Sequence, residues 1–123
     1  MAKMTNEAVV TFLAGAALGQ HVRVKFQSGS TTSPVEVEAA GAGEQHLGIT
    51  DAAAASGDPV AVRMRNSPGT QIATAAGAIA VGASIYGAAS GKVDDAVSGN
   101  AIGVALQAAS ADGDYVEIYE GGV

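Results

Sequence analysis

The stretch Asn100–Tyr119, N-A-I-G-V-A-L-Q-A-A-S-A-D-G-D-Y-V-E-I-Y, decides the fold of this chain. Its first part, Ile102–Leu106, alternates large apolar and small residues, as a half-buried strand does. Asp112-Gly113-Asp114 is a turn signal, because Gly tolerates positive φ and Asp side chains cap their own backbone. Tyr115–Tyr119 alternates again, in residue types that favour a pleated sheet. The stretch therefore predicts a strand, a turn and a second strand.

The same pattern occurs earlier in the chain, over Leu47–Met64, where two alternating runs flank an alanine run and a Gly-Asp turn. Gly48 and Gly103 are 55 residues apart, and Asp58 and Asp114 are 56 residues apart. The two offsets differ by one residue, as expected for a duplicated unit with one insertion in its turn. The sequence thus predicts an internal pseudo-repeat around residues 47–64 and 102–119, whose two copies close one barrel or sandwich core.

The composition predicts one small domain with a thin core. The chain has 123 residues, aromatic residues make up only 4% of them, and Trp is absent. Its core must therefore consist of Val, Ile, Leu and Ala, which bury little area each. Charged residues are 15% of the chain, against about 25% in an average protein. A thin core and a weakly charged surface together favour stabilisation by contacts between copies.

Charge and cysteine content exclude several classes of partner. A net charge of −6 lacks the basic footprint that nucleic acid requires, so no nucleic acid is expected as a partner. The absence of cysteine excludes disulfides and thiolate chemistry. Residues 9–18 are apolar but short and interrupted, so neither a signal peptide nor a membrane span is expected.

Short strands separated by turns are predicted over the rest of the chain, at residues 8–12, 20–26, 35–38, 72–75, 79–81 and 84–87. In the strand at 20–26 the inward set is Val22, Val24 and Phe26, and the outward set is His21, Arg23 and Lys25. Glu36 and Glu38 of the next strand are expected opposite the two outward cations. The alanine run at 51–56 favours a short helix as an alternative, with Asp51 as N-cap.

These patterns predict a mainly β fold, a small barrel or sandwich with at most one or two short helices. Residues 1–7 are predicted to form an N-terminal arm, because they show no hydrophobic period. Residues 8–123 are predicted to form a single β domain.

The residue types that carry chemistry show no catalytic or metal-binding arrangement. His21 and His46, the only histidines, lack carboxylates at ligand spacing and are interpreted as ordinary surface residues. Asp112-Gly113-Asp114 begins like a calcium loop but lacks the later ligands, and is interpreted as a turn. Adjacent Asp94 and Asp95 point to opposite faces of a strand and make no acid–base pair. No nucleophile or phosphate loop is present, so no enzyme, cofactor or metal is expected.

Several segments together match one group of phage proteins: Met1–Lys3, Gly87–Val93, Gly99–Leu106 and Gly113–Ile118, with Leu47–Val60 in the central position. In these segments the chain resembles the capsid cement, or decoration, proteins of tailed phages, in particular a short Ala- and Gly-rich family long catalogued without a function. The resemblance covers nearly the whole chain, and its motifs are packing and turn motifs.

The resemblance implies a structural virion protein that binds the outer surface of the phage head and stabilises contacts between major capsid protein subunits. Its implied partners are the major capsid protein and copies of itself, with a homotrimer favoured over a dimer, and no membrane. It is expected on the outer capsid surface after synthesis in the host cytoplasm. The N-terminal arm of such proteins lies on the capsid, so the implied capsid-binding residues are Ala2, Lys3, Met4, Thr5 and Asn6.

Three alternatives remain open at this level. The first alternative is that the chain is a different virion module, such as a head fibre base or a tail component, although it lacks heptads or a stalk signature. The second alternative is a biotinyl- or lipoyl-like carrier domain modified on Lys92, although Gly91 stands where such motifs place a hydrophobic or acidic residue. The third alternative is a small hydrolase, but the sequence contains no nucleophile, base or oxyanion arrangement that would support it.

Overall fold

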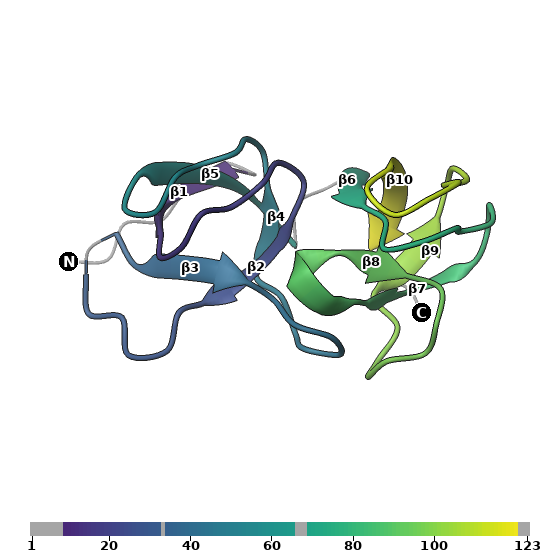
Figure 1. Cartoon of the computed structure of the whole chain (residues 1–123), viewed down its shortest axis with the longest axis horizontal. Coiled ribbons are helices and arrows are strands. Elements are labelled where there is room, and N and C mark those ends of the chain that lie inside the picture. The colour runs from purple at the N-terminus through teal and green to yellow at the C-terminus, as the bar shows by residue number, and fades with distance from the viewer. Residues whose placement is uncertain (1–8, 33, 66–68, 121–123) are drawn as a thin grey trace.

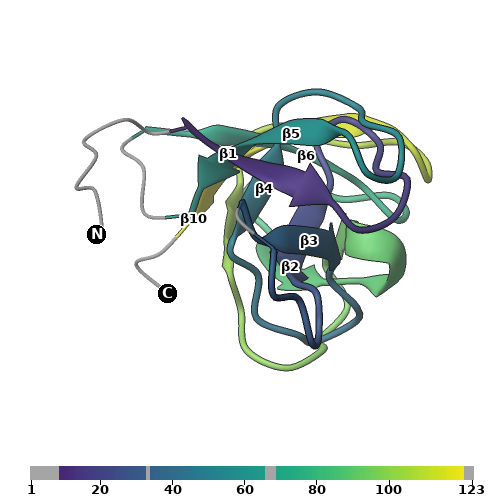
Figure 2. The same cartoon turned by 90° about the vertical axis from the view of Figure 1, so that its left-hand side faces the viewer.

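The computed structural model describes residues 9–32, 34–65 and 69–120, and within these ranges ten strands and one short 3₁₀ segment form two side-by-side units (Figure 1). The first unit is a closed barrel with the strand order β1-β3-β2-β4-β5. Its strands are β1 (Val9–Ala14), β2 (Arg23–Phe26), β3 (Glu36–Ala39), β4 (Gly48–Thr50) and β5 (Pro59–Met64). Figure 2 shows this barrel from its outer end.

The second unit is a five-stranded sheet with the order β6-β10-β9-β7-β8. Its elements are β6 (Gln71–Thr74), β7 (Ser84–Gly87), the 3₁₀ segment η1 (Ala89–Gly91), β8 (Val93–Asp94), β9 (Gly103–Ala105) and β10 (Tyr115–Glu120). The prediction of a mainly β fold built on a small barrel is therefore confirmed.

The two units have one topology, so the predicted repeat is confirmed and extends over both units. Strands β1 to β5 correspond to β6, β7, β8, β9 and β10 in that order, with matching neighbours and register. The parallel contact of Ala14 with Val37 that closes the first barrel recurs as a single bridge between Ala75 and Val93. Equivalent residues differ by 61 in the first two strands, by 56 in the third and fifth, and by 55 in the fourth.

Each unit has its own hydrophobic core, so the expectation that both copies close one core is wrong. The first cluster contains Ala14, Leu18, Val24, Val37, Val60 and Val62. The second is formed mainly by the second unit, including Ile85, Val93, Ile102, Val116 and Ile118, but Ile49 of β4 also belongs to it. The copies separate because each completes a five-stranded sheet with three further strands of its own half. A single domain over residues 8–123 stays a prediction.

Gly48 and Gly103 occupy equivalent positions at the starts of β4 and β9, and both must be glycine for the same reason. A Cβ atom on Gly48 would collide with the carbonyl oxygen of Arg63, and one on Gly103 would collide with that of Tyr119. In each unit the fourth strand thus approaches the fifth more closely than any side chain allows. The glycine that aligned the two copies in the sequence marks this close approach.

Three local expectations are wrong. The alanine run at 51–56 forms no helix, because Ala54 makes a bridge with Leu18 across the end of the barrel. Residues 79–81 form no strand beyond the equivalent bridge of Ile79 with Ala109. In β2 the expected burial of two side chains is reversed, since Arg23 is fully buried and Phe26 is 54% exposed. The second unit covers the outer face of β2, and alternation within one strand does not show such a neighbour.

Candidate interaction surface

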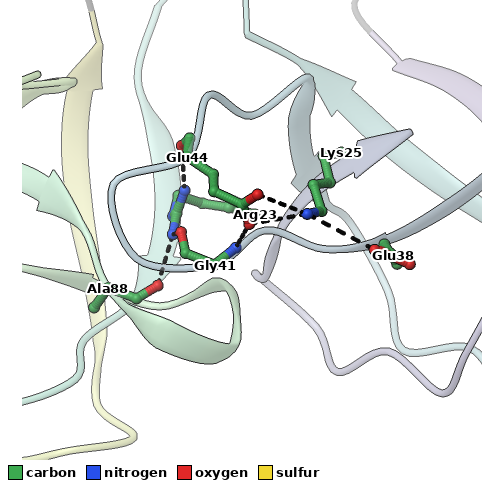
Figure 3. Close-up of polar contacts among 6 residues, drawn as sticks. All are labelled: Arg23, Lys25, Glu38, Gly41, Glu44 and Ala88. Carbon is green, nitrogen blue, oxygen red and sulfur yellow. Dashed lines mark hydrogen bonds and ion pairs between the residues drawn. The ribbon is translucent and has the colours of Figure 1, made fainter. Parts of the chain in front are cut away.

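The two units are joined through the side chain of Arg23, which has no exposed surface. Its Nε donates to the carbonyl oxygen of Lys92 at 2.9 Å, and Nη2 donates to that of Ala88 at 2.7 Å, both in the second unit. Nη1 donates to the carbonyl of Glu44 at 3.3 Å, and Nη2 also reaches that of Gly41 at 3.1 Å. Figure 3 shows the guanidinium between these two segments. One side chain thus fixes a turn of the first unit to the segment that follows β7.

Glycine allows this close fit of the second unit around Arg23. A Cβ atom on Gly87 would lie 2.8 Å from the guanidinium carbon, and one on Gly91 would collide with Val22. Burial lowers the pKa of the Arg23 guanidinium to about 10, so the side chain stays charged at neutral pH. Four backbone carbonyls from two units solvate this charge in place of water.

A second buried contact between the units joins His46, just before β4, to Glu120 at the end of β10. His46 Nε2 lies 2.6 Å from Glu120 Oε1, and the side chains are 0% and 5% exposed. Arg65 Nε lies 3.4 Å from the same oxygen. The prediction of an ordinary surface histidine is therefore wrong for His46, because its partner is 74 residues away in the sequence.

His21 lies in the turn before β2 with a φ of 59°, and not on the exposed face of a strand as predicted. Its ring packs edge-on against Tyr115 of the second unit, with 4.7 Å between ring centroids. The hydroxyl of Thr74 donates to the backbone carbonyl of His21 at 3.0 Å. Both histidines thus belong to the joint between the units.

The joint is expected to weaken in mild acid. Burial lowers the pKa of His46, an effect that the bond to Glu120 opposes, and Arg65 and Arg23 lower it further. Because the folded pKa lies below 6.5, the unfolded chain binds this proton first as the pH falls. The contribution of His46 is complete above pH about 6.5 and is lost as the pH falls through the folded pKa. Urea unfolding at pH 7.5 and 5.5 should show a lower free energy of unfolding at the acid pH.

The matched control for this pH dependence is His46→Gln, which keeps a hydrogen-bond donor toward Glu120. Burial also lowers the pKa of His21, so some acid dependence remains in this variant. The loss between the two pH values should be smaller in His46→Gln than in the unchanged protein. Equal losses would show that His46 does not titrate with unfolding.

A groove of about 210 Å³ lies along the joint on the side of β4 and β6. Its lining comes from both units and consists of His21, Ile49, Thr50, Asp51, Arg63, Thr70, Gln71 and Ile72. Gln71 is 4% exposed, and its amide donates to the carbonyl of Met64 at 3.3 Å. The groove is a mixed polar and apolar depression between two barrels, without a nucleophile paired with a base.

The outer face of the second unit carries apolar side chains with large exposed fractions. Tyr115 and Tyr119 alternate on β10 with the buried Val116 and Ile118, and are 53% and 47% exposed. Val81, Val97 and Leu106, in the connections of the same unit, are also exposed. Tyrosine and large aliphatic side chains are enriched in protein contacts, so this face is a candidate interaction surface.

The capsid-binding residues implied by the resemblance, Ala2, Lys3, Met4, Thr5 and Asn6, lie outside the described residues. The remaining candidates have structural partners. Gly113 has a φ of 94°, and the Asp114 carboxylate accepts bonds from the N–H groups of Ser110 and Ala111, as the turn prediction required. Lys92 Nζ lies 2.6 Å from Asp112 Oδ1.

The described ranges offer little ligand-binding chemistry. They contain no group of three or more His, Asp or Glu side chains placed to hold a metal ion. Asp94 Oδ1 accepts a bond from the N–H of Asp95, its neighbour in the chain. None of the described ranges contains a helix long and apolar enough to span a membrane.

Sequence reasoning missed the joint, because its residues look ordinary one by one. Arg23 stands in an alternating strand like any outward cation, and Glu120 follows Tyr119 like an exposed residue at a strand end. The usable signal was the repeat itself. When the alignment of the copies is extended over the whole chain, Arg23 is equivalent to Ser84 and Phe26 is equivalent to Gly87. These are positions at which the side chains of the two halves differ strongly in size.

Comparison with known proteins places this fold in a phage structural context. The family model described as phage cement protein matches residues 4–119. The structure is similar to the head fibre gp8.5 N base of bacteriophage phi29, with a TM-score of 0.78, 17% sequence identity and coverage of 92% of each chain. At that identity the likeness shows a shared fold. No curated protein sequence matches. On the family match over nearly all of its length, the chain belongs to the phage cement proteins.

Proposed function

We propose that this chain binds the outer surface of the phage head and stabilises contacts between major capsid protein subunits, without catalysis. The observation that carries the proposal is the buried joint at Arg23. A protein that braces a shell must keep its contact points at a fixed separation. Two units joined by a fully buried side chain that donates four hydrogen bonds meet that requirement better than two units on a flexible linker.

Weak single contacts suffice for this role, because a shell offers many identical binding sites. Copies that also contact one another gain effective concentration from each neighbour. We therefore include self-association in the proposal, as a homotrimer rather than a dimer. The weakly charged composition and the exposed apolar face of the second unit support it.

The proposed role is tested on expanded phage heads prepared without this protein. Purified protein should sediment with the heads up to a fixed number of copies per particle. The temperature at which the heads release their DNA should rise with occupancy, because a ligand that binds only the intact shell stabilises it. Heads that bind no protein, or bind it with no change in that temperature, would overturn the proposal.

The N-terminal arm is the proposed point of contact with the capsid. Deleting Ala2–Asn6 should weaken binding to the heads by about tenfold or more, equivalent to about 1.4 kcal/mol per site. An arm that adds a strand to a capsid edge would supply backbone hydrogen bonds of this worth. The melting temperature of the free protein should stay unchanged, since the first strand begins at Val9. Full occupancy by the shortened chain would assign the contact elsewhere.

The shared fold with a head fibre base makes the base of a fibre the second candidate function. A fibre base must carry a further protein or segment outward, whereas a cement protein need not. A map of decorated heads at low resolution separates the two, because a fibre base would show density projecting beyond the two barrels.

A further inference from the structure

The repeat places two equivalent rows of side chains on the two units, one covered and one exposed. Arg23, Ile49 and Arg63 are direct cross-strand neighbours on β2, β4 and β5, so their side chains share one face. Arg23 is 0% and Ile49 2% exposed, because the second unit lies against them. The equivalent row of the second unit is Ser84, Val104 and Tyr119 on β7, β9 and β10.

This second row is more open to solvent than the first. Ser84 is exposed, Val104 is half-buried and Tyr119 is 47% exposed. The same face of the same fold therefore forms an interface in one unit and is left open in the other. Of the three side chains of the open row, only that of Ser84 is small and polar, whereas Val104 and Tyr119 are of the kinds that pack in protein contacts.

Exposed apolar side chains recur around the open row, at positions whose equivalents form the joint. Val81 corresponds to Gln20, whose carbonyl accepts a bond from Thr74 of the second unit. Leu106 corresponds to Asp51, which lines the groove at the joint. Val97, 80% exposed, lies in the loop that corresponds to the turn from Gly41 to Glu44.

The sizes of the side chains complement each other when the joint is repeated between two copies. Within the chain, the large Arg23 lies against Gly87. The repeat equivalents reverse the sizes, since Ser84 replaces Arg23 and Phe26 replaces Gly87. Phe26 is 54% exposed and packs edge-on with Phe12 at 6.1 Å. The small residue on the open face thus leaves room for the large aromatic at the matching position of another molecule.

We propose that the Ser84–Val104–Tyr119 row of one molecule binds the first unit of a second copy of this chain near Phe26, as the two units of one chain bind each other. The contact is heterologous, so copies join head to tail and either close into a ring or extend. It rests on the self-association included in the proposed function, and names the surface through which that association occurs.

The test uses arginine substitutions that block each side of the contact separately. Tyr119→Arg places a long, charged side chain on the open row and blocks that side of the contact. Phe26→Arg blocks the opposite side. By light scattering in the absence of heads, the unchanged protein should be oligomeric and each variant monomeric. Their equimolar mixture should show twice the monomer mass, because one intact face of each variant remains. Ala111→Arg, at an exposed residue of the turn before β10, should leave the oligomer intact.

The outcomes separate this surface from the broader proposals. A monomeric unchanged protein would overturn self-association, and with it this contact. An oligomer that persists in Tyr119→Arg and Phe26→Arg would overturn this surface alone, as would a mixture that stays monomeric. Failure of the protein to bind heads would leave the light-scattering result unaffected. Should Tyr119→Arg lose its β-sheet circular dichroism signal, Val81→Arg blocks the same face from a side chain that is 66% exposed. This variant should also be monomeric.

Discussion

Replacing Arg23 by methionine is expected to lower the free energy of unfolding by about 3–5 kcal/mol, because several buried carbonyl groups lose their donor at a cost of about 1–3 kcal/mol each. Methionine fills a similar space but donates no hydrogen bond. The carbonyl groups of Gly41, Glu44, Ala88 and Lys92 would then stay buried without their donor. Urea unfolding at neutral pH, followed by circular dichroism, measures the change as a lower midpoint at a similar slope.

Lys25→Met, two residues along the same strand, is the matched control for Arg23→Met. Lys25 forms ion pairs with Glu44 and Glu38 at the surface, where solvent screens the charges, so its loss should be far smaller. Arg23→Lys should fall between the two, because a single ammonium cannot reach four carbonyls placed around a planar fork. Equal midpoints for Arg23→Met and Lys25→Met would show that the joint does not limit unfolding.

The second large effect is expected from Glu120→Ala, which should lower the free energy of unfolding by about 2–4 kcal/mol. The substitution leaves the buried Nε2 of His46 without its partner and the nearby Arg65 without its carboxylate. It acts on both units at once, because Glu120 ends β10 whereas His46 and Arg65 flank β4 and β5. The same urea unfolding experiment measures it.

Glu117→Ala is the control on the same strand. The Glu117 side chain accepts a bond from the hydroxyl of Thr70 at 2.6 Å at the surface, and takes no part in the joint. Its removal should change the unfolding midpoint little. Should the two glutamate variants unfold at the same midpoint, the buried contact between His46 and Glu120 would contribute nothing net to stability.

Both large effects lie at the joint between the units, whereas Tyr119 belongs to the open row proposed for self-association. A variant weakened at Arg23 should therefore lose head stabilisation through lost rigidity, whereas Tyr119→Arg should lose self-association with its fold intact. Head stabilisation and self-association therefore report separately on the rigid joint between the units and on the surface that binds a second copy.

The sequence alone predicted most of the strands and turns, because these depend on neighbours within a few residues, and it showed the repeat as a recurring pattern of residues. Alternation of apolar and small side chains located β9 and β10, and Asp112-Gly113-Asp114 located the turn between them. The resemblance to cement proteins rested on the same local motifs, and the family match over residues 4–119 confirms it. The arm at Ala2–Asn6 stays a prediction.

Only the tertiary structure decided how the halves combine and which polar residues are buried. Arg23 and His46 carry no local sign of burial, because their partners in the second unit lie 65 to 74 residues away in the chain. Alternation shows which side of a strand faces its own barrel, but not whether another barrel lies against the other side. The repeat in the sequence thus specified two similar units, and the packing of one against the other created both the buried joint and the open face.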